Sequence, residues 1–263
     1  MSLRLSLSST AVAGLAALAA GAAQAEPNIT GMWALSQPEG RLHAGPPPMI
    51  PAVRAANQAR QKIDQANHRL IGEAHTKCLP AGMPGLMQPP FGIEFLQTKG
   101  RVTILSEVSN LPRTIYLDEK IHPDTMIPGW NGHSIGHWEG DTLVVDTIGF
   151  NGRQPNVSEK MHITERIHLT EAGKYLVDDL TLDDPATYTE PYHISYRYKR
   201  AEGQEASELM EYVCEVDPAN LFAFESEMKA AGLPSDMDSS WTVEAFNHPA
   251  PKGEDAPKPV AAK

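Results

Sequence analysis

One histidine and two carboxylates of this sequence have the clearest capacity for chemistry. His133 lies in Gly132-His133-Ser134-Ile135-Gly136, whose small residues leave room for a ligand, and an imidazole can exchange protons near neutral pH. Asp146 and Glu165 each stand in a row of alternating apolar residues, which we expect to face the interior of a barrel. A carboxylate in such a row is either paired with a cation or has a raised pKa, which would suit a general acid or base. The sequence therefore predicts His133, Asp146 and Glu165 as catalytic residues.

Further side chains are predicted to contact a substrate. Asp178 stands in a third apolar row, within residues 176–182. Arg166 follows Glu165 directly, so it points to the other face of their strand and is not an obvious partner for that carboxylate. The alternative for each carboxylate is structural, either a buried ion pair or a bond that caps a turn. The predicted substrate-binding residues are His122, Trp130, His162, Arg166 and Asp178.

Ten histidines and ten methionines raise the question of a metal site. His133 and His137 lie four residues apart on an expected strand, a separation of about 13 Å, which is too far for one metal ion. His122 and Met126 could meet His133 and His162 in space, but no tight spacing of ligand residues supports such a site. We predict no metal ligand and no cofactor.

Two other kinds of chemistry find no support in the sequence. Ser134 lies in Gly-His-Ser-Ile-Gly, which resembles the Gly-x-Ser-x-Gly elbow of α/β-hydrolases, but that motif needs a strand-to-helix turn. Here the next residues, Trp138-Glu139-Gly140-Asp141-Thr142, predict a hairpin with Gly140 at its tip. No Walker motif or dinucleotide fingerprint is present.

The elements that position these residues are expected to be mostly strands. Short runs rich in β-branched and aromatic residues recur between turn residues, which indicates an antiparallel up-and-down β-barrel, since closure removes exposed strand edges. Gly31-Met32-Trp33 resembles the Gly-x-Trp that opens lipocalin-type barrels. The expected strands are Ile29–Leu35, Ile93–Gln97, Val102–Glu107, Thr114–Asp118, Ser134–Trp138, Leu143–Ile148, Met161–Leu169, Tyr175–Leu182, His193–Tyr198 and Leu209–Cys214.

One surface helix near the N-terminus is expected over Val53–Ile71, where charges alternate in sign among Ala and Gln. Residues 78–90, rich in Pro and Gly, are expected to form an irregular loop.

A longer motif resembles the signature of a largely uncharacterised family of exported bacterial proteins. The matching residues are 132–136 and 138–147, which together read GHSIGxWEGDTLVVDT. Cys78-Leu79-Pro80, Ile115-Tyr116-Leu117-Asp118 and Tyr212-Val213-Cys214-Glu215 extend the likeness over most of the chain. The chain departs from the family at His137, often Arg there, and at Val157, often His. The resemblance implies export but no particular reaction.

The first 25 residues have the features of a cleavable signal peptide. Arg4 precedes an uncharged run over residues 10–23, and Ala23-Gln24-Ala25 is the small-x-small pattern of a cleavage site, so the mature chain should start near Glu26. The predicted organisation is a signal peptide (1–25), one β-barrel domain (26–248) and a disordered tail (249–263), with the protein periplasmic or secreted.

Charge and cysteine content narrow the possible partners. The formal net charge of −11 disfavours nucleic acid and anionic membrane surfaces. The apolar run of the signal peptide is too short to span a bilayer, so no membrane insertion is expected. The two cysteines, Cys78 and Cys214, predict one disulfide in an oxidising compartment, with a catalytic thiol as the weaker alternative.

Three functional hypotheses remain open. The first is an exported β-barrel enzyme of lyase or isomerase type, performing cofactor-free acid/base chemistry (elimination, hydration or isomerisation) on a small apolar or aromatic molecule. The second is a barrel that binds or carries such a molecule without changing it, as barrels of this size often do. The third is a periplasmic metal-binding protein, suggested by the content of His and Met.

Overall fold

The computed structural model describes residues 26–36, 41–43, 45–66, 78–88, 92–107, 109–203, 208–214 and 226–232 of the 263-residue chain. The predicted signal peptide (1–25) and the predicted tail (249–263) lie outside the described residues. No helix among the described residues is long and apolar enough to cross a membrane.

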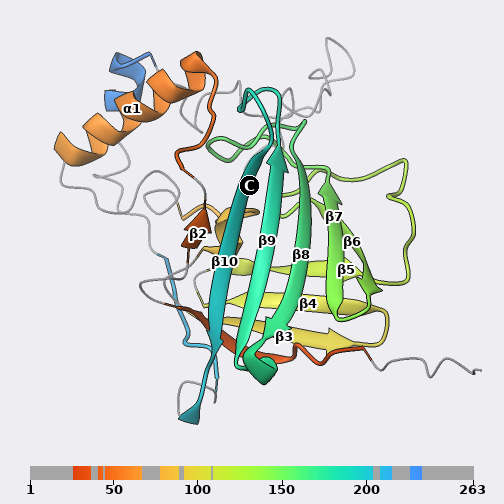
Figure 1. Cartoon of the computed structure of the whole chain (residues 1–263). Coiled ribbons are helices and arrows are strands. Elements are labelled where there is room, and N and C mark those ends of the chain that lie inside the picture. Colours follow the sequence, from red (N-terminus) through yellow and green to blue (C-terminus); the bar gives the residue numbers. More distant parts are fainter. Residues whose placement is uncertain are drawn as a thin grey trace, which may run out of the picture.

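Nine strands close into a β-barrel, which confirms the predicted fold class (Figure 1). The sheet order is β1-β3-β4-β5-β6-β7-β8-β9-β10, and pairing of β10 with β1 closes the ring, while β2 adds to β10. The strands are β1 (Gly31–Leu35), β2 (Arg41–His43), β3 (Ile93–Thr98), β4 (Arg101–Ser106), β5 (Ser109–Tyr116), β6 (His133–Glu139), β7 (Thr142–Ile148), β8 (His162–Thr170), β9 (Tyr175–Asp183) and β10 (Tyr192–Arg200).

One pair of neighbouring strands departs from the antiparallel pattern. β5 and β6 pair in parallel, through Ile115 with Ser134 and Tyr116 with Ile135, whereas the other neighbours around the ring are antiparallel. A closed ring with an odd number of strands cannot alternate in direction throughout, so one parallel pair is required. Parallel neighbours need a long connection, and residues 117–132 provide it between β5 and β6.

Most predicted elements are present with small shifts of their ends. The expected helix is present as α1 (Pro51–Ala66), which lies outside the barrel (Figure 1), and residues 67–71 of the predicted helix lie outside the described residues. The predicted loop over residues 78–90 contains a short 3₁₀ helix, Gly85–Met87, and a second one, Glu171–Gly173, joins β8 to β9. The predicted strand Leu209–Cys214 is wrong, because β1 already pairs with β10 and closes the sheet without it. The short strand β2 was not predicted.

The barrel interior is filled by side chains. The inward rows are mostly apolar, as period-two alternation requires, and Trp33 and Phe95 are among the largest side chains that are fully buried. The indole nitrogen of Trp33 donates to the Ile29 carbonyl oxygen at 3.0 Å, so its polar group is satisfied inside the core.

Residues 78–88 pack into the barrel and close part of it. Met83, Leu86 and Met87 are buried in the core cluster. The Tyr198 hydroxyl donates to the Met87 carbonyl oxygen, and the Met83 backbone N–H donates to the Trp130 carbonyl oxygen at 3.1 Å. Residues 78–88 therefore join β10 to the connection between β5 and β6.

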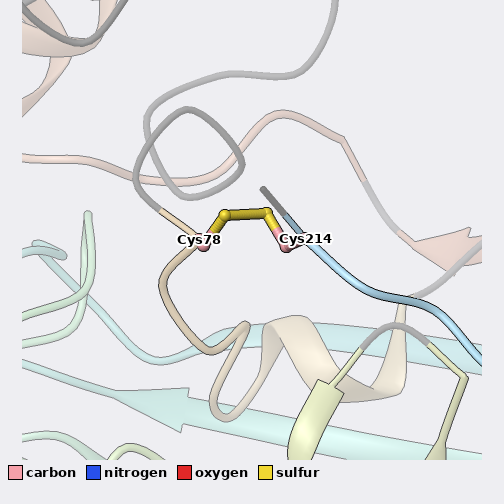
Figure 2. Close-up of a disulfide and its surroundings, with 2 residues drawn as sticks. All are labelled: Cys78 and Cys214. Carbon is pink, nitrogen blue, oxygen red and sulfur yellow. A yellow bond between two sulfur atoms is a disulfide. The ribbon is translucent and has the colours of Figure 1, made fainter. Parts of the chain in front are cut away.

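The predicted disulfide is present and anchors this segment (Figure 2). Cys78 at its start is bonded to Cys214, with the Cα atoms 5.6 Å apart and a sequence separation of 136. A structural disulfide is typical of proteins in oxidising compartments, and one that closes so long a loop strongly restricts the unfolded chain.

Replacing both cysteines by serine should lower stability markedly. Losing the disulfide that closes so long a loop should lower the free energy of unfolding by about 4–5 kcal/mol on the chain-entropy model. This corresponds to a fall in Tm of roughly 10 °C or more for a domain of this size. Calorimetry of the Cys78→Ser/Cys214→Ser variant measures this, with reduced wild-type protein as the control. An unchanged Tm would show that residues 78–88 hold their place without the disulfide.

Candidate functional site

The three predicted catalytic residues lie on two sides of the barrel wall. Glu165 on β8 points inward and is fully buried, as predicted. On β7 the buried residues are Leu143, Val145 and Thr147, so Asp146 lies on the outer face, and the prediction that Asp146 belongs to an inward row is wrong. His133 is also on the outer side of β6, where its neighbour Ser134 is buried.

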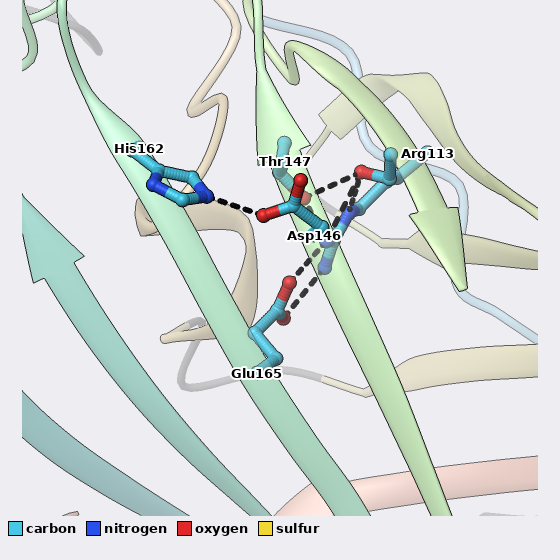
Figure 3. A network of polar contacts seen from close by, with 6 residues as sticks. Arg113, Asp146, Thr147, His162 and Glu165 are labelled. Carbon is cyan, nitrogen blue, oxygen red and sulfur yellow. Dashed lines mark hydrogen bonds and ion pairs between the residues drawn. The ribbon is translucent and has the colours of Figure 1, made fainter. Parts of the chain in front are cut away.

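The error at Asp146 has a physical cause. The stretch Leu143-Val144-Val145 is apolar on both faces, so alternation alone does not identify the inner one. Both faces are covered here, because the connection 117–132 lies over the outer one: His122 bonds to Asp146, and Met126 packs against Gly149. Figure 3 shows the outcome, with Asp146 directed toward His162 and the next residue, Thr147, toward Arg113.

The glycines beside His133 serve strand packing and leave no space for a ligand. A Cβ at Gly132 would lie 2.7 Å from the Ile148 carbonyl oxygen, and one at Gly136 would lie 2.8 Å from Ile115 Cγ2. Gly132 also has a φ of +65°, which a larger residue rarely adopts. The small residues around His133 therefore do not indicate a binding site.

A polar layer crosses the barrel interior around Arg113 (Figure 3). The fully buried guanidinium of Arg113 donates to both carboxylate oxygens of Glu165, at 2.8 Å for Oε1 and in a short contact for Oε2. It also donates to the Ser134 hydroxyl at 3.2 Å and to the Thr147 hydroxyl at 3.1 Å. Burial lowers the pKa of Arg113, but the Glu165 carboxylate outweighs burial and leaves that pKa raised. The layer is thus a buried ion pair with its donors satisfied.

Asp178 extends this layer onto β9. It is fully buried, as its apolar row predicts, and neither carboxyl oxygen has a hydrogen-bond partner among the described residues. Burial raises the pKa of Asp178 well above its usual range, and the negative charge of Glu165 raises it further, against the opposing effect of Arg113. The Asp178 carboxyl therefore favours its neutral form more than an exposed aspartate does.

Substitutions in this layer should distinguish the ion-paired carboxylate of Glu165 from the carboxyl group of Asp178, whose pKa is raised. Glu165→Gln leaves Arg113 buried without its counter-ion and should cost about 3–5 kcal/mol. Asp178→Asn preserves the neutral state. Because the folded pKa of Asp178 is raised, its contribution to stability is complete below its unfolded pKa of about 4 and is lost as pH rises. The Asn variant should therefore gain stability relative to wild type from pH 4 toward neutral and alkaline pH.

Urea unfolding of both variants at a series of pH values measures these differences. Equal destabilisation by Asp178→Asn and Glu165→Gln at every pH would mean that Asp178 is a charged partner of Arg113.

A second polar cluster lies on the outer face of β6, β7 and β8. His122 Nε2 bonds to Asp146 Oδ2 at 3.0 Å, and His162 Nε2 makes a short contact with Oδ1 of the same carboxylate. His122 Nδ1 lies 2.9 Å from His133 Nδ1, and His133 Nε2 lies 3.4 Å from Glu119 Oε2. The structure thus brings together three histidines that the sequence places far apart. We call Glu119, His122, His133, Asp146 and His162 the outer histidine cluster.

Protonation of the outer histidine cluster should weaken the contact of residues 117–132 with the barrel. The two Nδ1 atoms of His122 and His133 can form a hydrogen bond only while one of them lacks a proton. Burial lowers the pKa of His133, and its neighbour His122 lowers it further, against the opposing effect of Glu119. Burial raises the pKa of Asp146, but its hydrogen bonds to His162 and His122 outweigh burial and leave that pKa lowered.

Both shifts act in the same direction, because stability gained from a lowered pKa is present at higher pH and is lost on acidification. The ring of Tyr116 stacks on the ring of His133, with their centroids 5.2 Å apart. His133→Phe keeps a ring in this contact but removes the hydrogen bond to His122. At pH 7 the variant should melt about 2–4 °C below wild type, as expected for one lost hydrogen bond of about 1 kcal/mol. At pH 5 this difference should disappear.

Thermal melts at both pH values test this, with His193→Phe as the control, since His193 is exposed and bonds to Thr181 away from the cluster. A difference that is the same at both pH values would mean that the contact does not depend on protonation.

No group of three or more His, Cys, Asp or Glu among the described residues is arranged to hold a metal ion.

Arg166 lies on the outer face of β8 and donates to Glu139 at 3.0 Å at the end of the β6–β7 hairpin. The predicted turn at that hairpin is present, with Gly140 at a φ of +59°.

A pocket of about 260 Å³ lies at one end of the barrel, beside residues 78–88. Its walls come from four parts of the chain: residues 79–88, the connection that carries Trp130, residues 153–157, and the ends of β9 and β10 with Tyr188. α1 and the segment before it add Arg60, Pro47 and Met49. The aromatic lining residues are Trp130, Tyr188, Tyr192 and Tyr196, and the aliphatic ones on β9 and β10 are Leu182 and Ile194.

Of the predicted site residues, Trp130 is the one that lines this pocket. It lies near the end of the connection 117–132, and its carbonyl oxygen accepts hydrogen bonds from the Met83 backbone and the Gln154 side chain. Arg113, Glu165 and Asp178 are not among the lining residues, so the polar layer does not contribute to the pocket wall. The outer histidine cluster does not reach the pocket either.

Two arginines line the pocket and were missed in the sequence. Arg60 comes from α1 and donates to Asn57 Oδ1 at 3.4 Å. The guanidinium of Arg153 lies over the Trp130 ring, with its central carbon 5.1 Å from the ring centroid. Neither arginine belongs to an alternating row, so strand periodicity could not identify them. Arg113 could have been found, because extending the predicted strand Thr114–Asp118 by one residue at its start puts Arg113 on the same face as the buried Ile115.

Comparisons with known proteins give matches among solved structures. No protein-family model matches the chain, and no curated protein matches it. Among solved structures, the crystal structure of wild-type fluorescent protein UnaG is similar at 15% sequence identity and a TM-score of 0.31, covering 65% of this chain and 96% of UnaG. A structure of a UnaG mutant matches at 18% identity and a TM-score of 0.27, covering 43% of this chain and 72% of that one.

Proposed function

We propose that this protein binds a small molecule with an apolar or aromatic body in the pocket at the end of its barrel. The observation that carries the proposal is the pocket itself, with its volume of about 260 Å³ and its lining of aromatic, aliphatic and proline side chains. Ligand sites are typically concave, mostly apolar and supplied with a few polar groups. An apolar cavity of about 150 Å³ accepts benzene, so this pocket has room for a larger molecule.

Binding without chemical change is the function that the geometry supports best. The predicted acid/base residues do not meet, since His133 and Asp146 lie on the outer face and Glu165 is buried in an ion pair with Arg113. None of the three lines the pocket. Their catalytic roles therefore stay predictions, and the carrier hypothesis takes precedence over the lyase or isomerase hypothesis.

We further propose that the protein performs this function outside the cytoplasm, in the periplasm or as a secreted protein. The Cys78–Cys214 disulfide supports an oxidising compartment. The proposed signal peptide, and membership of the exported family that the motif at residues 132–147 resembles, agree with that location.

A ligand screen on the mature, disulfide-bonded protein tests the proposal. The panel contains one-ring and two-ring aromatic compounds and terpenoids, both neutral and charged, and each compound that raises Tm is titrated and then analysed by mass spectrometry. We expect at least one compound to bind with one-to-one stoichiometry and to be recovered unchanged. Recovery of an altered compound would support the enzyme hypothesis instead.

Two matched substitutions locate the bound compound. Trp130→Ala removes an aromatic wall of the pocket and should weaken binding by about tenfold, or 1.4 kcal/mol. Trp138→Ala removes the same side chain at the β6–β7 hairpin, outside the pocket, and should leave the affinity within about twofold of wild type. Equal effects of the two substitutions would place the binding site elsewhere.

A further inference from the structure

We infer that the ligand of the barrel-end pocket is an organic anion whose carboxylate pairs with Arg153. This inference rests on the proposed binding function and specifies the chemical class of the ligand. It follows from the state of the Arg153 side chain, from the charges of the pocket wall and from the shape of the site.

Arg153 presents unused hydrogen-bond donors in a confined place. Its Nε atom is buried and has no hydrogen-bond partner among the described residues. No ion pair connects its guanidinium to a described carboxylate, and the contact that holds it in position is the one with the face of Trp130. Buried donors are nearly always satisfied in proteins, so a guanidinium in this state indicates a missing acceptor.

The charges of the pocket point to an anion as that acceptor. Among the described residues that line the pocket, Arg60 and Arg153 are the charged ones and both are positive. This contrasts with the chain as a whole, whose 33 acidic residues outnumber its 22 Lys and Arg residues. A positive pocket in an acidic protein attracts anions locally while the rest of the surface repels them.

The geometry favours a carboxylate attached to an aromatic or apolar body. The guanidinium of Arg153 lies over the Trp130 ring, and its forked N–H groups match the two oxygens of a carboxylate. Gln88, Gln154 and Asn156 offer neutral polar groups nearby, whereas Tyr188, Tyr192 and Ile194 offer apolar surface for the body of the ligand. The position of Arg153 is itself fixed, since its backbone N–H donates to Asn151 Oδ1 at 3.0 Å.

The deciding experiment compares a carboxylic acid with its amide. Isothermal titration of the mature, disulfide-bonded protein with 3-phenylpropanoate and with 3-phenylpropanamide isolates the effect of charge, because the two compounds have nearly the same shape. We expect the acid to bind at least tenfold more tightly than the amide. Arg153→Gln should abolish this preference while leaving the affinity for the amide within twofold of wild type.

Two more variants complete the design. Arg166→Gln removes the same charge from the outer face of β8, where Arg166 pairs with Glu139, and should leave the preference for the acid intact. Arg153→Lys keeps the positive charge and loses the forked donors, so it should reduce the preference by about fivefold. It replaces Arg153→Gln as the test if the glutamine variant does not fold.

Each outcome is decisive. Equal affinity for the acid and the amide in the wild-type protein would overturn the inference but leave the pocket as a binding site for neutral molecules. A preference for the acid that survives in Arg153→Gln, or that is undiminished in Arg153→Lys, would overturn the assignment to Arg153. Failure of both compounds and of the aromatic panel would overturn the proposed function as well.

Discussion

The closure of nine strands into one ring is the constraint on which the rest of this structure depends. An odd ring must contain a parallel pair, which here is β5 with β6, and such a pair needs a long connection between its strands. Residues 117–132 form that connection. They deliver Trp130 to the pocket and His122 to the outer face of the wall. One topological requirement thus creates a pocket wall at the barrel end and a polar cluster outside it.

The buried pair of Arg113 and Glu165 decides where a ligand can be held. Removing two charges from water is costly, and the pair is tolerated because hydrogen bonds to Ser134 and Thr147 satisfy the remaining donors. Burial raises the pKa of Asp178 beside them. Arg113, Glu165, Ser134 and Thr147 satisfy one another inside a packed barrel, so we assign them a structural role. None of these residues lines the pocket, which residues 79–88 border at the barrel end.

The sequence predicted the fold and the buried acids better than it predicted the site. The alternation around Glu165 and Asp178 was clear, because the outer faces of β8 and β9 carry polar and charged residues, so both acids were placed inside correctly. Asp146 was placed on the wrong face, since Leu143, Val144 and Val145 put apolar residues on both faces of β7. Arg113 was missed because a proline such as Pro112 argues against a strand. The predicted strand therefore began at Thr114, whereas β5 begins at Ser109. Arg153 was missed because it lies in a loop, where no periodicity indicates which side chains face a ligand.

The location of the bound molecule is the most direct test of this account. The measurement is an NMR titration of ¹⁵N-labelled protein with a compound from the ligand screen, in which the amide chemical shifts are monitored. The account predicts that the largest shifts occur at Trp130, Arg153 and Gln154, while the amides of His122 and Asp146 stay unchanged. Shifts centred on the outer histidine cluster would contradict it and would make the outer face of the barrel the functional surface.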